Sequence, residues 1–544
     1  RRWSVLVLVA LPLAFYLRRH AVDMPLLIDL VYLEIVIGLG AFARRAFRLP
    51  APRDARDYLQ AFVLGFLVWS VLAWSASALD AGSIKGLRWL TVLLAIPAAC
   101  ARHTPLALYL WRRLGAQTTG DRFWCGALTA WIAVLYARSN VVFGYDAQWY
   151  GLRPEYVLDP GSSVFQPLGL IAPVHYYPKL YEVFLLPVSA FGDTSVIVGM
   201  SIGMLVLILL ACHVLATRID LPPRARMPVL ALVATLPALA NSALEPKPDV
   251  ISALFVLLAA DAALAWARSR SSADALWMLA AGLLACLAKL SAVPFVGMLV
   301  LAAAIAAWRR RGEAGVAADP RTTRLAVAAS AAALIVAGFV IARTWLLTGM
   351  PTVVQTNLWQ ALGMHLAEPA GALTWARAPD WADLPTLIVD WLFRPQRLAH
   401  VVIAWVGNVW AWCGLLAFSA ALLTQGAPRG NRVRLPLIAL IATGVVLAVG
   451  VGYPVRGSDG NYFLAALLPA ILVGATAAFT RLAATPRALA VALACLPAFA
   501  LFQASYAFVS AGWWPGTRTF DLDLSRNWHD TRRARWGKLE YAGM

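Results

Sequence analysis

The sequence predicts an all-α polytopic membrane protein with about 13–15 transmembrane helices, because apolar segments of bilayer length recur along it. Of its 544 residues, 61% are hydrophobic and 14% are charged, whereas soluble proteins carry about 25% charged residues. The mean hydropathy is +0.70, and the apolar runs extend from Trp3 almost to Ser510. A soluble chain of this length would divide into several domains joined by polar linkers. One integral membrane unit, with the lipid bilayer as its partner, agrees better with the pattern.

The individual spans follow from the thickness of the bilayer, since a hydrocarbon core of about 30 Å needs about 20 apolar residues per helix. Residues 1–122 are interpreted as N-terminal transmembrane helices, 123–511 as the main transmembrane module and 512–544 as a short extracytoplasmic tail. The expected spans start near Trp3, Met24, Tyr58, Leu87, Phe123, Thr194, Met227, Val250, Ala275, Val293, Leu325, Leu398, Leu435, Phe463 and Arg487.

Arginine clusters between the spans orient the helices, because basic loops remain in the cytoplasm. With these clusters inside, loops 139–193 and 348–397 face the opposite, extracytoplasmic compartment. Loops of about 50 residues are usually functional or disordered. Four prolines interrupt the apolar stretch between Gln166 and Phe191, which predicts short helices lying in the membrane interface. The cytoplasmic clusters are Arg44/Arg45/Arg48, Arg112/Arg113, Arg218/Arg224/Arg226, Arg268/Arg270, Arg309/Arg310/Arg311 and Arg429/Arg432/Arg434.

Two classes of function are disfavoured by composition. The formal net charge is +18, but the basic residues sit in short clusters between apolar runs, so no nucleic-acid partner is predicted. The six cysteines are scattered singly in apolar segments without CxxC spacing. Neither a disulfide framework nor a zinc site follows from them.

The first candidate site follows the span that ends near Asn140. Asp146 lies there at the membrane lip among Tyr145, Trp149 and Tyr150. A partly desolvated carboxylate in such a place can act as a general base for a hydroxyl nucleophile. The structural alternative is a helix cap flanked by aromatic interface anchors.

A second candidate site lies further along the same loop. His175 offers an acid or a metal ligand, and Lys179 offers a point charge for phosphate. Tyr177 and Tyr181 offer rings that stack on sugars. The structural alternative is an interfacial belt with a snorkelling lysine.

The third candidate site precedes an apolar helix that begins at Val250. Asp249 is placed to cap that helix, and it also converges with Glu245 and Lys247 on the side where Asp146 is expected. Two carboxylates at helix mouths can share a substrate or a divalent ion. The candidate metal ligands are therefore Asp146, His175 and Asp249, and the participation of a divalent cation stays open.

Further basic residues are expected on this side. Arg343 and Arg456 would form a cationic recess that holds a lipid-linked phosphate, or they would snorkel to lipid headgroups. Lys289 lies within an apolar run, where a charge is expensive.

The order of these motifs resembles the C-type (GT-C) glycosyltransferase superfamily, which includes bacterial aminoarabinose transferases and protein O-mannosyltransferases. Asp146 resembles the acid in the first long extracytoplasmic loop of that family. The stretch from Tyr176 to Tyr181 is similar to its Pro/Tyr-rich interfacial segment, and Asp249 to the second acid of bacterial members. The resemblance covers Phe123 to about Ser510.

This resemblance implies a GT-C-like enzyme of the bacterial inner membrane with its active site facing outward. It implies that a sugar moves from a polyprenyl-phosphate donor to a hydroxyl of a glycan, lipid or protein acceptor, with inversion. Asp146 would deprotonate the acceptor, and Asp249 would be the second catalytic acid. A transporter or flippase of a lipid-linked glycan is the alternative. The phosphate-binding residues would be Lys179, Lys247, Arg343 and Arg456, and the sugar- or acceptor-binding residues Tyr145, Trp149, Tyr150, His175, Tyr177, Tyr181 and Tyr462.

The loop charges predict that Asp146, His175, Asp249 and Arg456 all lie on the extracytoplasmic side. A membrane-impermeant thiol reagent is therefore expected to reach cysteines placed at these positions from outside intact cells. Labelling that occurs only from the cytoplasmic side of inverted vesicles would reverse the predicted orientation.

Overall fold

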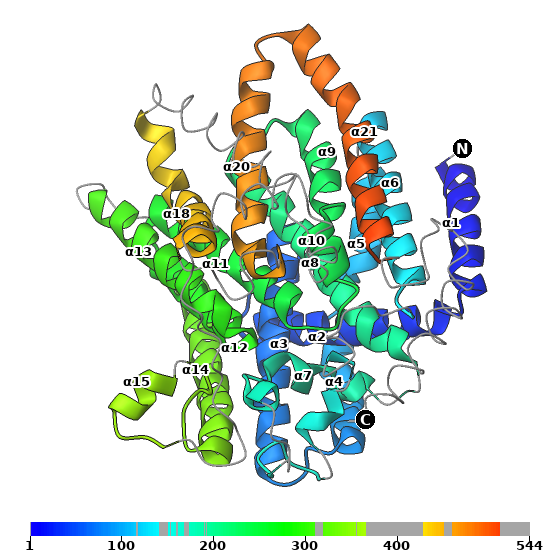
Figure 1. The fold of residues 1–544 in the computed structure, drawn as a ribbon. Helices are drawn as coiled ribbons and strands as arrows, with labels where there is room; N and C mark the ends of the chain where they lie inside the picture. The colour runs from blue at the N-terminus through cyan, green and yellow to red at the C-terminus, as the bar shows by residue number, and fades with distance from the viewer. Residues whose placement is uncertain are drawn as a thin grey trace.

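The structure is a computed structural model that describes residues 2–115, 118–140, 151–152, 154–158, 161–167, 173–189, 191, 193–310, 319–354, 356–365, 428–450 and 460–511. The described residues form helices and no strand (Figure 1). This confirms the predicted all-α class.

The longer helices pack side by side, and shorter helices join or interrupt them. The longer helices are α1 (Arg2–Arg19), α2 (Asp23–Ala46), α3 (Ala55–Ala78), α4 (Ile84–Cys100), α6 (Thr119–Ala137), α8 (Thr194–Arg218), α11 (Asp249–Ser269), α12 (Ser272–Ala288), α13 (Val293–Arg309), α14 (Pro320–Thr348), α18 (Pro428–Gly450), α20 (Leu464–Leu482) and α21 (Pro486–Ala511). The shorter helices are α5 (Leu106–Gly115), η2 (Pro154–Val157), η3 (Pro173–Tyr176), α7 (Leu180–Leu185), η4 (Leu186–Val188), α9 (Pro223–Ala234), α10 (Pro237–Ser242), η5 (Leu290–Ala292), α15 (Thr356–Ala361) and η9 (Gly460–Phe463).

Within the described part of the chain, eight helices are long and apolar enough to cross a membrane: α2, α3, α8, α11, α13 with η5, α14, α20 with η9, and α21. Two shorter apolar helices, Ser272–Ala288 and Leu435–Leu447, accompany them. Large apolar side chains such as Trp89 and Leu346 are more than half exposed, as expected for surfaces that contact lipid. These features define a multi-pass membrane protein.

The structure does not form the single long helix that the sequence predicts from Met227. Helix α9 ends at Ala234, and the short α10 begins at Pro237. Proline has no N–H for the preceding turn and its ring clashes with that turn, so a helix cannot continue through this position undisturbed. The span expected from Leu398 lies outside the described residues.

Helix α11 lies in the middle of the bundle and packs against α8, α12, α13 and α20 (Figure 1). Helices α2 and α3 belong to the same hydrophobic core as α8 and α11. The shared core crosses the boundary at residue 122, so the separation of residues 1–122 from residues 123–511 rests on the sequence alone. The five described cysteines are free thiols.

Glycines allow α2 and α3 to approach each other closely. A Cβ on Gly40 would lie 1.7 Å from the carbonyl oxygen of Ala61, and one on Gly65 would lie 1.7 Å from that of Val36. Both obstacles are backbone atoms, which cannot rotate away. Small residues play this role in many membrane-helix interfaces.

The described short helices of loop 139–193 are buried against other helices, and their expected place in the membrane interface stays a prediction. Leu180, Tyr181 and Phe184 of α7 are each at most 1% exposed. The hydroxyl of Tyr32 donates a 2.8 Å hydrogen bond to the carbonyl oxygen of Phe184, and the two rings stack. Apart from Glu182, the residues of α7 are apolar or aromatic, so its burial between α2, α3 and α12 removes apolar surface from water.

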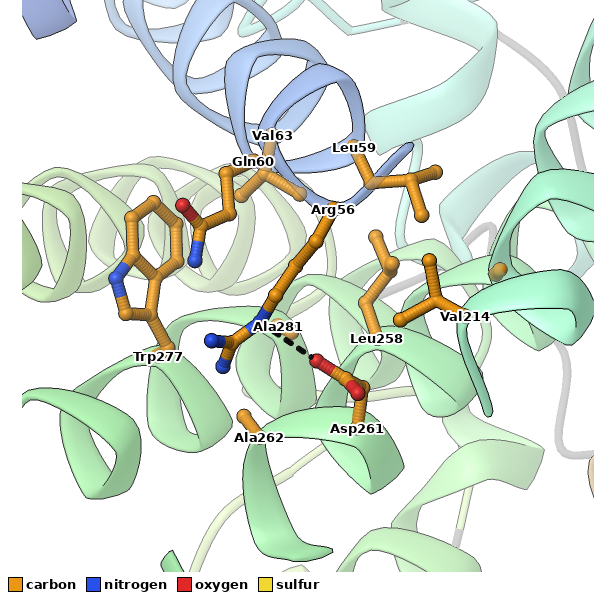
Figure 2. Close-up of a pocket in the computed structure, with 11 residues that line it drawn as sticks. Arg56, Leu59, Gln60, Val63, Val214, Leu258, Asp261, Ala262, Trp277 and Ala281 are labelled. Atoms are coloured by element: carbon orange, nitrogen blue, oxygen red, sulfur yellow. Dashed lines mark hydrogen bonds and ion pairs between the residues drawn. The ribbon is translucent and has the colours of Figure 1, made fainter. Parts of the chain in front are cut away.

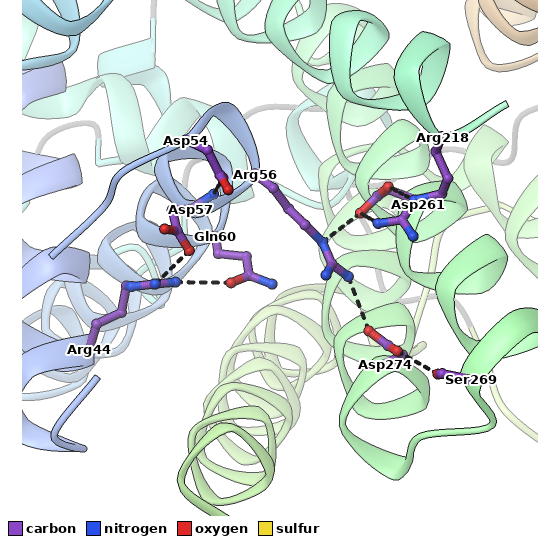
Figure 3. Close-up of polar contacts among 9 residues, drawn as sticks. All are labelled: Arg44, Asp54, Arg56, Asp57, Gln60, Arg218, Asp261, Ser269 and Asp274. Carbon is purple, nitrogen blue, oxygen red and sulfur yellow. Dashed lines mark hydrogen bonds and ion pairs between the residues drawn. The ribbon is translucent and has the colours of Figure 1, made fainter. Parts of the chain in front are cut away.

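Polar contacts join helix ends that the loop charges place on the same side. At the predicted cytoplasmic end, Arg44 donates to Asp57 at 2.5 Å and Arg56 donates to Asp261 at 3.0 Å (Figure 3). At the other end, the Tyr136 hydroxyl donates to the Asp29 carboxylate. The contacts therefore agree with the predicted alternation of helix direction. Which end faces the cytoplasm stays a prediction.

We expect Gly40→Ala and Gly65→Ala each to destabilise the protein by about 1–3 kcal/mol, because an overpacked interface must shift its backbone. Gly338→Ala in α14 is the matched control, since no atom lies within 4 Å of its Cβ position and alanine favours helix. Thermal unfolding in detergent measures the difference. Equal melting temperatures for all three variants would contradict the close packing.

Candidate functional site

Asp249 occupies the first turn of α11 and is 4% exposed. The sequence places it as the cap of this helix, but the N-cap residue is Pro248 and no side chain caps the helix. The two prolines before α11 prevent an earlier helical start. The Asp249 carboxylate is therefore available for contacts with other helices.

Two residues from other helix ends hold the Asp249 carboxylate. Its Oδ1 accepts hydrogen bonds from Nζ of Lys289 and, at 2.9 Å, from Nδ2 of Asn461. The Lys289 Nζ also lies 3.9 Å from the centroid of the Tyr462 ring, a cation–π contact. Lys289 lies in the break between α12 and η5, and Asn461 in η9. The start of α11, the break between α12 and η5, and η9 therefore meet at the Asp249 carboxylate.

This junction lines a pocket. Among the described residues, no donor contacts the second oxygen of Asp249, Oδ2. The Oδ1 of Asn461 is buried and has no hydrogen-bond partner. A site with spare acceptors suits a ligand that donates hydrogen bonds, such as a sugar hydroxyl. The remaining lining residues include Ser252, Ser291, Phe295 and Tyr462.

The loop before α11 adds a second ion pair beside this pocket. Lys247 Nζ lies 2.7 Å from Oε2 of Glu245, and both side chains are buried. A Cβ on Gly151 would lie 3.3 Å from the carbonyl oxygen of Pro246 and 3.5 Å from Cγ of Lys247. Gly151 directly follows the predicted Asp146 stretch in sequence. Gly151 therefore lies against the residues that precede Asp249.

A second buried group of charges comes from loop 139–193 and α14. Lys179 Nζ donates to Oε1 of Glu182 at 2.8 Å. Arg343 donates from Nε to the carbonyl oxygen of Val164 at 2.9 Å and from Nη2 to that of His175 at 3.2 Å. Arg343 Nη1 and Glu182 Oε2 are buried without hydrogen-bond partners. This group thus keeps one spare donor and one spare acceptor.

Burial and neighbouring charges control protonation in this group. The pKa of His175 is lowered to about 4, first because the ring is buried and then because Lys179 and Arg343 are positive. Burial also lowers the pKa of Lys179, against the opposing effect of Glu182. The imidazole of His175 is therefore neutral at pH 7.

The structure places the other predicted site residues as follows. The Tyr181 hydroxyl forms a 2.8 Å hydrogen bond with Ser201 Oγ inside the core, so its ring is not open to a sugar. Tyr177 is half-buried beside Tyr176, and Tyr462 lies under Lys289. Outside the described residues lie Tyr145, Asp146, Trp149, Tyr150 and Arg456.

Sequence reasoning did not assign Lys289, Asn461 and Glu182 to the site. For Lys289 the signal was present, because a lysine inside an apolar run needs a partner. Asn461 and Glu182 carry no comparable signal in the sequence. In the described residues, no group of three or more His, Cys, Asp or Glu side chains is placed to hold a metal ion.

Fold and site together define a multi-pass α-helical membrane protein with buried ion pairs at the end predicted to be extracytoplasmic. Comparison of the chain with protein-family models, with curated proteins and with solved structures gives no match.

The lowered pKa of His175 predicts a pH-dependent stability. An unfolded histidine titrates near 6.5, so between that value and about 4 the unfolded state binds more protons than the folded state. Stability is therefore complete above the unfolded pKa and falls as the pH drops towards 4. Between pH 7 and 5, the melting temperature of wild type is expected to fall more than that of His175→Gln. The exposed His365 provides the control His365→Gln, which is expected to follow wild type; the same fall in His175→Gln as in wild type would refute this.

Proposed function

We propose that this protein is a membrane glycosyltransferase that moves a sugar from a polyprenyl-phosphate donor to a hydroxyl acceptor, with inversion. The observation that carries the proposal is the Asp249 carboxylate, which lines a pocket and has one oxygen held by Lys289 and Asn461. A tethered carboxylate with a free acceptor oxygen is preorganised to orient a hydroxyl. The GT-C-like fold, the bacterial inner membrane and the outward-facing site belong to this proposal.

In the proposed reaction, Asp146 removes the proton of the acceptor hydroxyl, whose oxygen attacks the anomeric carbon. The bond between that carbon and the phosphate oxygen breaks, and the electron pair leaves with polyprenyl phosphate. Asp249 binds a hydroxyl of the sugar or the acceptor. The packing of Gly151 against Lys247 and Pro246 supports a shared site for the two acids.

Negative charge accumulates on the leaving phosphate as the bond breaks, so positively charged side chains stabilise the transition state. Among the described residues that the sequence predicts to bind phosphate, Arg343 supports this role best, because its Nη1 has no hydrogen-bond partner. Lys179 and Lys247 are each paired with a glutamate, so each adds less net charge. Arg456 is proposed for the same role on the basis of the family resemblance.

The second candidate function is a flippase of a lipid-linked glycan. The observation that favours it is the Asp249–Lys289 ion pair between helices, since transporters place such pairs in broken helices. The two functions differ in one measurable event, because a flippase breaks no bond to phosphate.

Asp146→Asn and Asp249→Asn are both expected to abolish sugar transfer while the protein still folds, since an amide replaces each carboxylate without leaving a cavity. Release of polyprenyl phosphate from a radiolabelled donor in proteoliposomes measures transfer. Asp80→Asn is the matched control, because Asp80 is exposed at the same end of the bundle. Near-normal turnover of either active-site variant would remove that residue from the mechanism. Wild-type protein that moves the donor across vesicles but never releases polyprenyl phosphate would favour the flippase.

Removal of positive charge is expected to slow transfer more than it weakens donor binding, because charge on the bridging oxygen grows in the transition state. For Arg343→Met, Lys247→Met and Arg456→Met we expect turnover to fall roughly tenfold to a thousandfold, about 1.4–4 kcal/mol. Lys85→Met, an exposed lysine at the same end, is the control. Donor affinity is measured separately on the Asp146→Asn background; equal losses in affinity and turnover would show that these cations only bind the donor.

A further inference from the structure

A second cavity lies at the opposite, predicted cytoplasmic end of the bundle. It is lined by residues of α3, α8, α11 and α12 (Figure 2). One part of its lining is apolar, and the other part is polar. The apolar lining comes from Leu59, Val63, Ala211, Val214, Leu258, Ala262 and Ala281, and the polar lining from Arg56, Gln60, Asp261 and Trp277.

The carboxylates near this cavity already have donors. Asp261 Oδ1 accepts from Nε of Arg218, and its Oδ2 accepts from Nε of Arg56 at 3.0 Å and from Nη2 of Arg218 at 3.2 Å (Figure 3). Arg56 Nη2 donates to Asp274 at 3.0 Å, and the second oxygen of Asp274 accepts from Ser269. Each carboxylate oxygen in this network therefore already accepts at least one hydrogen bond.

The unused groups of the polar lining are donors. Gln60 accepts a 3.0 Å hydrogen bond from Arg44 through its carbonyl oxygen, and within the described chain its Nε2 has no acceptor. The same is true of Nη1 of Arg56. Trp277 is 5% exposed, and its Nε1 is buried without a hydrogen-bond partner. Arg56, Gln60 and Trp277, which carry these N–H groups, thus line the cavity together with Asp261, and the rest of the wall is apolar.

We propose that this cavity binds the phosphate group of an anionic amphiphile, with the headgroup at Arg56, Gln60 and Trp277. Phosphate oxygens only accept hydrogen bonds from these donors, and the guanidinium supplies charge assistance. The apolar wall contacts the lipid chain, which favours a membrane lipid over free phosphate. Anionic lipids concentrate in the cytoplasmic leaflet, where basic pockets between helices bind their headgroups. This ligand is distinct from the donor proposed for the other end.

Native mass spectrometry of the purified full-length protein tests the proposal. Protein incubated with phosphatidylglycerol or with phosphatidylcholine is released from detergent, and the retained lipid is counted. We expect phosphatidylglycerol to be retained in preference to phosphatidylcholine. Trp277→Phe keeps the ring but removes the N–H, and it is expected to lower that retention about tenfold, the effect of one hydrogen bond to a charged group.

Trp74→Phe is the matched control, since Trp74 also has a buried Nε1 without a partner but does not line this cavity. Gln60→Leu provides a second variant with the same expected loss. Retention that is equal for the two lipids, or unchanged in both Trp277→Phe and Gln60→Leu, would overturn the proposal.

A competition arm separates the two sources of phosphate. Inorganic phosphate at millimolar concentration is expected not to displace the lipid, because it gains nothing from the apolar wall. Displacement that depends on Trp277 would keep the phosphate site but assign it to a free anion. The assay measures no sugar transfer, so its outcome is independent of the proposed enzyme activity.

Discussion

Charge inside a membrane-spanning bundle must be paired, and the ion pair of Asp249 with Lys289 shows how this chain meets that requirement. Neither group lies in the middle of a continuous helix. Asp249 opens α11, Lys289 lies where α12 ends, and Asn461 lies in the turn before α20. Helix ends expose unpaired backbone groups that favour polar surroundings. The same interruptions therefore accommodate the charges and create the pocket beside them.

The two ends of the bundle have opposite chemistry once their internal contacts are counted. Beside Asp249, the unused atoms are the acceptors Asp249 Oδ2 and Asn461 Oδ1, which suit hydroxyl groups. Beside Asp261, the carboxylates accept from Arg56 and Arg218, and the unused atoms are N–H groups, which suit phosphate. Both arrangements contain acids and bases, so composition alone does not distinguish them. The hydrogen bonds of each carboxylate distinguish the two arrangements.

The buried α7 segment connects the site to the rest of the fold. Its backbone and aromatic groups contact Tyr32, while Lys179 and Glu182 at its beginning form a buried pair near Arg343. The packing around α7 holds these charged groups in place. The ion pair with Glu182 offsets the cost of burying Lys179. From residue type alone, Glu182 would be expected in solvent.

Hydrophobic periodicity and length determined the fold class, because each membrane span must satisfy its own backbone within a helix of about 20 residues. The sequence also singled out Asp249, Lys247 and Lys289 as polar groups in apolar surroundings. Their partners were decided by tertiary structure, since Asn461 is 212 positions from Asp249 in sequence and no local pattern records that contact. The burial of α7 was decided in the same way: an apolar segment broken by prolines satisfies the rules for an interfacial helix and for a buried one. Its burial depends on neighbouring helices such as α3 and α12, which come from distant parts of the chain.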